Sequence, residues 1–316
     1  MDVGWSWLCL TIFFSSISYI FCSAGNRWTY NGTLGPSHWH VDYPKCGGNK
    51  QSPIDIETSK VEFNPDLTVF DLSELSQTEN IGMTLENVNG HTVEVVISGS
   101  ANMLVSGGSL DNKYKVKQFH FHWGQADERG SEHEIDEKQF PMEMHIVLYS
   151  MTYADIDLAI DKPKGLAVLA FLFEVGETNA NFQPLLSNFD SIQHSGNETS
   201  ISTFSLKSLL PANTENYFRY EGSLTTPPCY ESVVWSIFTT RITVSEQQLN
   251  QFRSIKRIRE AGGEGEENLV DDFRPLQKLN NRKVYTNNVN LDTSGQNMLS
   301  VSHTFALLSV LLALSF

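Results

Sequence analysis

Tyr114-Lys-Val-Lys-Gln-Phe-His-Phe-His-Trp123 is the stretch that determines the fold class, because polar and apolar residues alternate along it. Side chains two residues apart share one face of a β-strand, so the pattern predicts a strand with two phenylalanines and a tryptophan on one face. His120 and His122 then project together from the opposite face. The sequence therefore predicts a sheet with two candidate metal ligands beside each other on it.

A second alternating segment, Met142-Glu-Met-His-Ile-Val-Leu-Tyr149, contains a third histidine, His145. Zinc binds neutral imidazole, and a catalytic zinc uses three protein ligands and keeps a fourth position for water. His120, His122 and His145 are therefore the predicted ligands of a Zn2+ ion.

Gln118 and Glu143 each stand two residues before one of these histidines and on the same strand face. A histidine that binds zinc normally donates its second ring N–H to an acceptor, which fixes the tautomer and the orientation of the ring. We therefore expect Gln118 and Glu143 to orient His120 and His145. Without such acceptors, histidines on a strand are more often ordinary surface or core residues.

Other segments also favour strands. Residues 91–97 and 231–238 alternate, and Leu166–Val175 is a continuous apolar run typical of a strand buried on both faces. No internal repeat interrupts the pattern. We expect one mainly β domain over residues 25–285.

Helical patterns are short. The clearest covers Ser245–Arg259, where Ser245 is the expected N-cap and Gln248 stands three residues after it. A weaker helical pattern covers residues 182–193. These segments predict a few short helices around the sheet.

The composition limits the classes of partner. The 316-residue chain has a net charge of −15 and is 40% hydrophobic, which is enough for a full core. No basic cluster is present, so nucleic acid is not an expected partner. The acidic balance otherwise indicates only a soluble surface.

The N-terminus predicts secretion. Residues 5–22 are apolar and are followed by the small residues Ser23, Ala24 and Gly25, which indicates a signal peptide over residues 1–24. Asp2 stands where a basic residue is usual. A buried helix is the alternative.

The C-terminus predicts a lipid anchor. Residues 304–316 are apolar but too short for a membrane span, which needs about 20 helical residues. Small residues around Ser294, a polar spacer and this tail match a GPI-attachment signal. We expect attachment at Ser294, a stalk over residues 286–294 and a discarded propeptide over residues 295–316. A packed C-terminal helix is the alternative.

The cysteines fit the same compartment. Cys9 and Cys22 lie in the predicted signal peptide, which leaves Cys46 and Cys229 as the simplest disulfide pair. Two N-glycosylation sequons are also present, Asn31-Gly-Thr33 and Asn197-Glu-Thr199.

Several further motifs accompany the histidines, in order, along residues 28–285. They are Gln51-Ser-Pro-Ile-Asp-Ile56, Asn89-Gly-His91, Gly130-Ser-Glu-His133 and Ser223-Leu-Thr-Thr-Pro-Pro228. With the two histidine strands, they resemble the α-class carbonic anhydrases. Segments such as Tyr217-Phe-Arg-Tyr220 are most similar to the GPI-anchored membrane-bound types four and fifteen.

The resemblance implies an α/β roll. The expected domain is a large, twisted, mixed but mostly antiparallel sheet of about ten strands, with short surface helices and zinc at the base of a cone-shaped cleft. It also implies a disulfide between Cys46 and Cys229. Cis peptide bonds are expected at Ser52-Pro53 and Pro227-Pro228.

The resemblance also implies roles for single residues. Thr225 corresponds to the residue that orients the zinc hydroxide, Glu132 to the acceptor of its proton, and a backbone carbonyl near Asp272 to the partner of His122. His91 is the expected proton shuttle, since an imidazole titrates near neutral pH. Bicarbonate is expected to contact Thr226. The implied carbon dioxide wall is apolar, and consists of Val147, Val168, Leu224 and Trp235. The implied water-carrying wall is polar, and consists of Tyr30, Asn89 and His91.

The implied function is reversible hydration of carbon dioxide to bicarbonate and a proton at the outer face of a membrane. An acatalytic carbonic anhydrase-like binding module is the alternative, and a zinc hydrolase of other substrates is a further rival. Two residues depart from the family pattern, Glu94 and Asp272, and we expect them to tune the kinetics. The sequence names no partner transporter.

Overall fold

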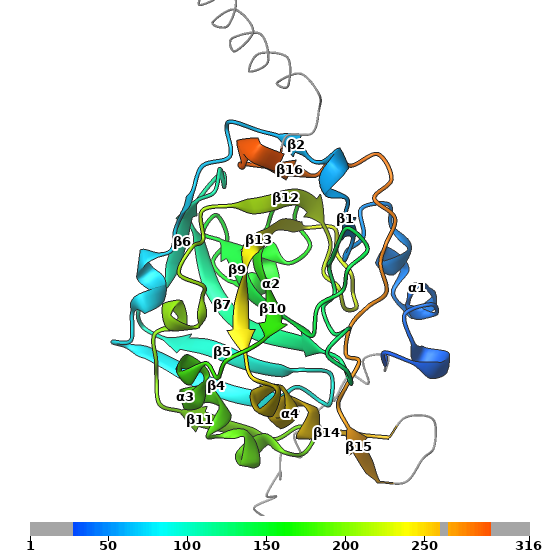
Figure 1. Ribbon diagram of the computed structural model, residues 1–316, viewed down its shortest axis with the longest axis vertical. Coiled ribbons are helices and arrows are strands. Elements are labelled where there is room, and N and C mark those ends of the chain that lie inside the picture. Colours follow the sequence, from blue (N-terminus) through cyan, green and yellow to red (C-terminus); the bar gives the residue numbers. More distant parts are fainter. Residues whose placement is uncertain (1–27, 260–264, 292–316) are drawn as a thin grey trace, which may run out of the picture.

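The computed structural model describes residues 28–259 and 265–291. The predicted signal peptide, the predicted GPI site at Ser294 and the predicted propeptide lie outside these residues. One large twisted sheet runs through the domain (Figure 1). Within the described part of the chain, no helix is both long and apolar enough to cross a membrane.

In the described part of the chain, the main sheet contains 12 strands, and ten of them form one continuous path. In spatial order the path is β11 (Glu198–Ile201), β4 (Ile81–Asn87), β5 (Val93–Gly99), β7 (Tyr114–Trp123), β9 (Met142–Ser150), β10 (Leu166–Val175), β13 (Val233–Val244), β12 (Tyr217–Gly222), β16 (Tyr285–Thr286) and β2 (Glu62–Phe63). The remaining two strands lie off this path, β3 (Phe70–Asp71) and β6 (Leu104–Gly107). Among the described residues, only the β10–β13 and β16–β2 pairs of this sheet are parallel, so the predicted mixed, mostly antiparallel sheet is confirmed.

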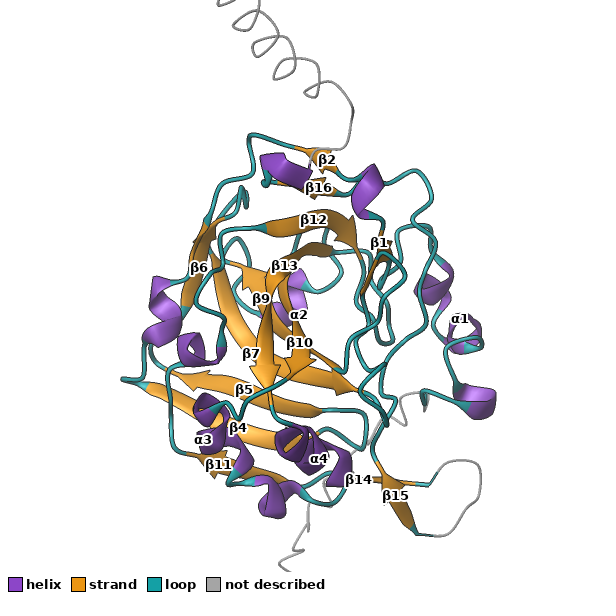
Figure 2. Ribbon diagram, in the orientation of Figure 1, coloured by secondary structure: helices purple, strands orange, loops and turns teal. Residues whose placement is uncertain are grey.

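Two small sheets flank the main one. In the first, β1 (Asp55–Ile56) pairs with β8 (Glu134–Ile135), and in the second, β14 (Lys256–Ile258) pairs with β15 (Glu266–Asn268). Short helices lie mostly at the periphery (Figure 2). The α-helices are α1 (Trp39–Asp42), α2 (Ile156–Ala159), α3 (Gln183–Leu186) and α4 (Glu246–Ser254). The 3-10 turns are η1 (Gly32–Leu34), η2 (Pro44–Gly47), η3 (Thr58–Lys60), η4 (Ser73–Ser76), η5 (Ala180–Phe182), η6 (Phe189–Ile192), η7 (Leu206–Leu209) and η8 (Val289–Leu291).

Two predicted helices differ from the observed ones. The helix predicted up to Arg259 begins with the expected Ser245 and Gln248 capping box, but it ends at Ser254 because the next residues form β14. The helical pattern over residues 182–193 is broken into η5, α3 and η6. Pro184 explains the start of α3, since proline is tolerated only in the first helical turn.

The central strands separate two hydrophobic clusters. The aromatic side chains of β7, Phe119, Phe121 and Trp123, are fully buried in the larger cluster. Val147 and Val168 belong to the second cluster, which packs on the other side of these strands. Because alternate residues face opposite ways, the histidines of β7 lie on the side of the second cluster.

The chain remains part of the domain beyond the expected boundary at residue 285. Thr286 belongs to β16 and is fully buried, and Leu291 packs against the second cluster. Residues 286–291 therefore do not form a free stalk. Both prolyl bonds expected to be cis, Ser52-Pro53 and Pro227-Pro228, are cis.

Two of the features linked to secretion fall within the described residues, the disulfide and the sequons. Cys46 and Cys229 form the predicted disulfide, which joins residues 183 positions apart. Asn31 and Asn197 are exposed, as glycan acceptors must be. The disulfide fits an oxidising, extracellular compartment.

Candidate metal centre

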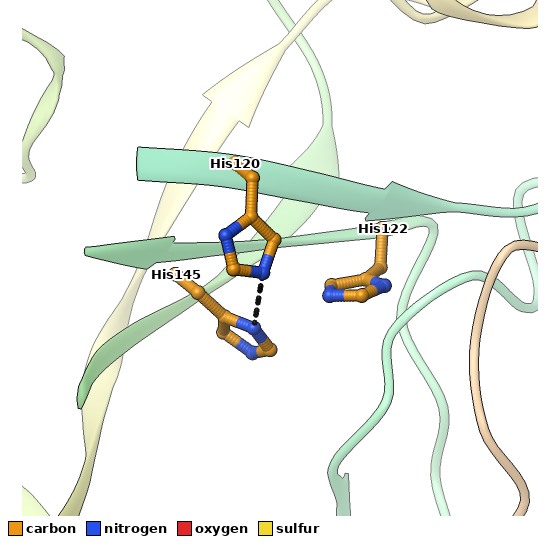
Figure 3. Close-up of side chains that lie close together, drawn as sticks. All are labelled: His120, His122 and His145. Carbon is orange, nitrogen blue, oxygen red and sulfur yellow. Dashed lines mark hydrogen bonds between the residues drawn. The ribbon is translucent and has the colours of Figure 1, made fainter. Parts of the chain in front are cut away.

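The three predicted ligands meet on two neighbouring strands (Figure 3). His120 of β7 lies directly opposite His145 of β9, and His122 follows two residues later on β7. Ring centroids are 5.1 Å apart for His120 and His122, 5.1 Å for His120 and His145, and 4.8 Å for His122 and His145. One nitrogen from each ring lies within 4.8 Å of the other two, so the histidines could share one metal ion.

Hydrogen bonds fix which nitrogen of each ring is available. His120 Nδ1 lies 2.8 Å from Gln118 Oε1, and His145 Nε2 lies 2.7 Å from Glu143 Oε1. His122 Nδ1 donates to the carbonyl oxygen of Asp272 over 2.7 Å, as the resemblance implied. Each acceptor keeps a proton on the outer nitrogen. His120 Nε2, His122 Nε2 and His145 Nδ1 are left with lone pairs for a metal.

Two buried polar atoms at the candidate site lack a hydrogen-bond partner in the described part of the chain. His122 Nε2 and Glu132 Oε2 are buried, lie 3.4 Å apart and have no hydrogen-bond partner among the described residues. Burial is the main cause of the lowered pKa values of His120 and His122, and the neighbouring histidines add to the effect. A low pKa keeps the imidazoles neutral, which is the form that binds zinc. The residues present therefore fit a zinc ion.

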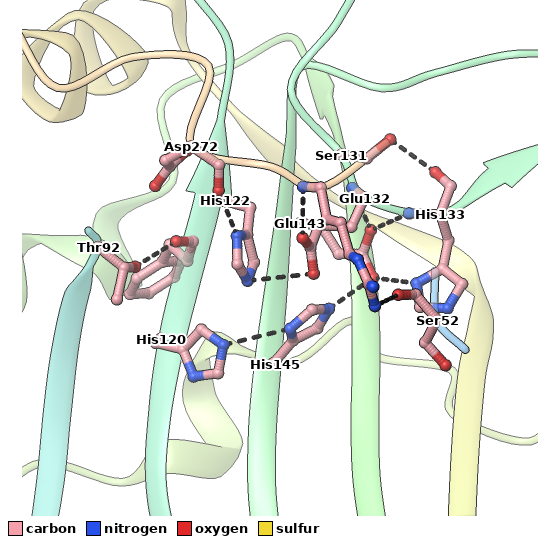
Figure 4. A network of polar contacts seen from close by, with 12 residues as sticks. Ser52, Thr92, His120, His122, Ser131, Glu132, His133, Glu143, His145 and Asp272 are labelled. Atoms are coloured by element: carbon pink, nitrogen blue, oxygen red, sulfur yellow. Dashed lines mark hydrogen bonds and ion pairs between the residues drawn. The ribbon is translucent and has the colours of Figure 1, made fainter. Parts of the chain in front are cut away.

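A second layer of buried groups lies behind His145 (Figure 4). Glu143 Oε1 is 2.7 Å from both His145 Nε2 and His133 Nδ1, and Glu143 Oε2 accepts two backbone N–H bonds of 2.8 Å from Glu132 and His133. Burial acts to raise the pKa of Glu143, but His133 and His145 lower it far below its ordinary value. Glu143 is therefore a buried anion that orients His145.

This layer extends further than the sequence predicted. His133 Nε2 lies 2.7 Å from the hydroxyl of Tyr220, which lies 2.8 Å from Ser52 Oγ. All three side chains are buried. The motifs that contain Ser52 and His133 were the only sequence signal, and they did not indicate that the residues connect to a metal ligand.

The arrangement around Thr225 differs from the expected one. Thr225 is buried, but Glu132 Oε2 has no hydrogen-bond partner among the described residues, so Thr225 does not donate to it here. Glu132 Oε1 accepts the backbone N–H of Arg274 over 2.9 Å. Glu132 is thus fixed beside the predicted ligand His122, and its Oε2 can still accept a hydrogen bond. Thr226, the expected bicarbonate contact, is partly exposed.

The predicted apolar wall forms a row across three strands. Val168 of β10 pairs with Val147 of β9 on one side and with Trp235 of β13 on the other. The row lies two residues from His145 along β9, on the same face, and the rings of Trp235 and His145 are 4.9 Å apart. Leu224 packs against the same cluster. An apolar surface therefore adjoins the histidines.

The predicted polar wall is built from loops. Asn89 and Gly90 have φ of 50° and 76° and form the tight turn between β4 and β5, which presents His91. Gly90 is required there, since a Cβ would lie 2.6 Å from that of Arg257. The ring of His91 stacks on Trp28, with centroids 3.8 Å apart, and Tyr30 lies nearby at 6.4 Å. The sequence did not indicate the contact with Trp28.

Two residues that depart from the family pattern both lie beside the ligands. Glu94 pairs with His120 across β5 and β7, and burial, with the nearby Glu86, raises its pKa to about 7. Asp272 accepts the backbone N–H of Trp123 through Oδ1, and burial raises its pKa well above the ordinary value. Both carboxyl groups are therefore held toward the neutral form.

Comparisons with known proteins agree with this geometry. The family model for eukaryotic-type carbonic anhydrase matches residues 34–288. The chain is 36% identical to carbonic anhydrase 12 of Homo sapiens over 264 residues, which cover 83% of this chain and 73% of that protein. It is 37% identical to carbonic anhydrase 6 of Canis lupus familiaris over 276 residues, which cover 86% of this chain and 83% of that protein. With these matches, the fold and the three converging histidines, the chain belongs to the eukaryotic-type carbonic anhydrase family.

Proposed function

We propose that this protein catalyses the zinc-dependent, reversible hydration of carbon dioxide to bicarbonate and a proton at the extracellular face of a membrane. The observation that carries the proposal is the convergence of His120 Nε2, His122 Nε2 and His145 Nδ1 beside the row of Val147, Val168 and Trp235. The first set suits a metal ion, and the second suits an apolar substrate.

Zinc, when bound, acts as a Lewis acid that lowers the pKa of water to about 7, a value long established for carbonic anhydrases and not obtained from this structure. The side chains supply the rest. The apolar row and Leu224 hold carbon dioxide by excluding water, because the substrate has no charge to bind. Glu143, Gln118 and the carbonyl of Asp272 keep the three imidazoles in one tautomer and orientation.

Thr225, Glu132 and Thr226 are proposed to orient the reacting groups. Glu132 Oε2 is buried and has no hydrogen-bond partner among the described residues, so it is available to accept the hydroxyl proton of Thr225. A threonine hydroxyl has one proton, so when it donates to Glu132 it can only accept a hydrogen bond on its other side. The group that it faces near the metal must then be a hydrogen-bond donor. Thr226 would then contact the bicarbonate product.

His91 is proposed to carry the proton away. It lies on the turn between β4 and β5, and Tyr30 and Asn89 lie beside it in the polar wall. An imidazole can accept a proton on one nitrogen and release one from the other, and its ordinary pKa suits transfer near neutral pH.

The proposed location rests on features along the whole chain. The Cys46–Cys229 disulfide and the exposed sequon residues Asn31 and Asn197 fit secretion. The GPI-attachment pattern at Ser294 supports anchorage by a lipid. Treating expressing cells with a phosphatidylinositol-specific phospholipase should release the protein, and complete retention on the membrane would contradict the anchor.

Stopped-flow hydration of carbon dioxide by the purified protein tests the activity. We expect acceleration that disappears after removal of zinc by a chelator and returns when zinc is restored. A folded protein that binds one zinc ion but gives no acceleration would favour the acatalytic alternative.

A further inference from the structure

A cavity of about 390 Å³ is lined by residues of β12, β13 and β16. These strands lie in the upper part of the sheet in Figure 1. None of the three metal-ligand histidines lines it. We propose that this cavity is a binding site for a small anion that carries phosphate groups. The proposal does not depend on the zinc chemistry.

The charge of the cavity is opposite to that of the chain. Five basic residues line it, Lys50, Lys164, Arg219, Arg282 and Lys283. Only two acidic residues line it, Asp111 and Glu221, so the formal charge of the lining is +3. The whole chain has 22 basic and 37 acidic residues and a net charge of −15. Basic groups gathered in a concave surface of an acidic protein concentrate anions there and repel cations.

Arg219 is a buried basic residue whose position in the site is fixed by hydrogen bonds. Arg219 is only 8% exposed. The central carbon of its guanidinium lies 5.3 Å from the ring centroid of Tyr217 and 5.7 Å from that of Phe70. Nε and Nη2 donate to Ser236 Oγ, and Nη2 also donates to the carbonyl oxygen of Gly108. These bonds leave Nη1 without a hydrogen bond within the described part of the chain. The structure thus holds a rigid guanidinium with one nitrogen uncommitted, in the wall of the cavity.

Two of the three lysines that line the cavity are loosely held, whereas the third, Lys283, pairs with Glu62 over 2.9 Å. Lys50 Nζ lies 3.6 Å from Glu221, and Lys164 Nζ lies 3.8 Å from Glu221 and 3.3 Å from Asp111. Both lysine side chains are about half exposed, at 54% and 48%. Exposed pairs of this kind contribute little to stability, so the ammonium groups can turn toward a ligand at small cost.

Arg282 contributes a fixed positive charge to the lining of the cavity. Its guanidinium lies over the ring of Tyr220, at 5.4 Å, and donates to the carbonyl oxygens of Glu221, Gln51 and Lys278. The fixed guanidinium of Arg282, the buried guanidinium of Arg219 and the exposed ammonium groups of Lys50 and Lys164 share one lining, which suits a phosphate or diphosphate group. The cavity volume lies within the range of about 300 to 1,000 Å³ found for small-molecule sites.

The test is isothermal titration of the full, zinc-loaded protein with inorganic pyrophosphate. The cavity variant is the double substitution Lys50→Gln and Lys164→Gln, which removes two exposed charges and leaves the buried Arg219 in place. The matched control is Lys60→Gln with Lys207→Gln, two exposed lysines outside the cavity. Hydration of carbon dioxide should be the same in all three proteins, because none of these lysines touches the metal centre.

We expect saturable binding at one site, with an affinity at least ten times lower in the cavity variant and unchanged in the control variant. No saturable binding, or equal binding by the two variants, would overturn the proposal, and equal binding would place the anion elsewhere, for example on the zinc. A second arm identifies the source of the phosphate. Co-sedimentation with phosphatidylcholine vesicles, with and without phosphatidic acid, should depend on Lys50 and Lys164 only if a lipid headgroup enters the cavity.

Discussion

The inner site and its rim are built in different ways. His122, His145, Glu143 and His133 are at most 1% exposed, and all four lie on or beside the central strands. At the rim, His91 is partly exposed on a hairpin turn, and its ring stacks on that of Trp28. The sheet register therefore positions the proposed metal ligands, whereas turns and aromatic contacts position the proposed proton shuttle.

The two regions also differ in how many neighbouring groups a single substitution would disturb. In the inner site Glu143 alone joins two histidines and two backbone N–H groups, so one substitution disturbs several partners. The rim is a separate aromatic cluster around Tyr30 and Trp39, next to the Cys46–Cys229 disulfide. The following substitutions test whether inner changes abolish the chemistry while rim changes only tune it.

The largest effect is expected from His145→Ala. This change removes one of three ligands and leaves Glu143 as a buried anion without one of its partners. Zinc-dependent hydration should fall by more than about a hundred-fold, beyond the loss typical of a residue that only supports a ligand. Zinc content and stopped-flow rates measure it. His194→Ala, at an exposed histidine, is the control, and equal rates for both variants would contradict the assignment of the ligand.

Glu143→Gln should come next. The amide preserves the shape but removes the charge that His133 and His145 share, so we expect zinc affinity to fall by about 10 to 100-fold. Competition with a chromogenic chelator measures the affinity. Gln118→Ala, which affects only the partly exposed His120, should weaken zinc binding less. A larger loss of zinc affinity for Gln118→Ala than for Glu143→Gln would contradict the expectation that the buried hydrogen-bond partner contributes more than the partly exposed one.

Loss of the disulfide in Cys46→Ser with Cys229→Ser should destabilise the protein by about 2 to 5 kcal/mol. The disulfide lies in the aromatic cluster at the rim, and neither cysteine belongs to β7 or β9, the strands that carry His120, His122 and His145. We therefore expect a lower melting temperature but nearly normal zinc affinity in the folded protein. Denaturant unfolding measures the loss of stability, and the chelator assay measures the zinc affinity. A selective loss of zinc affinity without a loss of stability would show that rim and inner site are not independent.

Glu94→Gln should stabilise the zinc-free protein at high pH. The carboxyl group has an ordinary pKa of 4.5 but a pKa of about 7 in the folded chain, so folding disfavours its ionised form. Its contribution to stability is intact below about pH 4.5, declines as the pH rises to 7 and is lost above that. The variant should be more stable than the parent above pH 7, by at most about 3 kcal/mol, and equal to it near pH 4.

Denaturant unfolding at several pH values checks this prediction. Glu128→Gln, at an exposed carboxyl group, is the matched control and should show no such pH dependence. A constant difference between Glu94→Gln and the parent at every pH would mean that packing, and not ionisation, causes the effect.

The smallest effect is expected from His91→Ala. In weak buffer the turnover number should fall by about tenfold, less than the 10² to 10⁴ typical of general acid–base groups, because water and buffer replace a shuttle in part. The KM should change little, since His91 lies on the rim. Added imidazole should restore the rate. A turnover number that is unchanged in weak buffer would remove His91 from the proton route.

Local patterns were sufficient for much of the fold. The bounds of β7 and β10 match the alternating segment 114–123 and the apolar run Leu166–Val175, because both patterns reflect burial that is set along a single strand. The end of α4 was not predictable in the same way. Residues 256–258 suit a helix locally, but they pair with β15, and tertiary pairing overrides local propensity.

The inner site divides in the same manner. The alternation of residues along β7 and β9 already placed Gln118, His120 and His122 on one face and Glu143 with His145 on another, since side chains in a strand repeat every two residues. Contacts across long separations were different. His122 with Asp272, His133 with Tyr220, and Trp28 with His91 join residues that are far apart in the chain. No local pattern carries the register between strands or the packing of a loop on them, so only the folded sheet could bring these partners, and the cationic cavity beside Arg219, together.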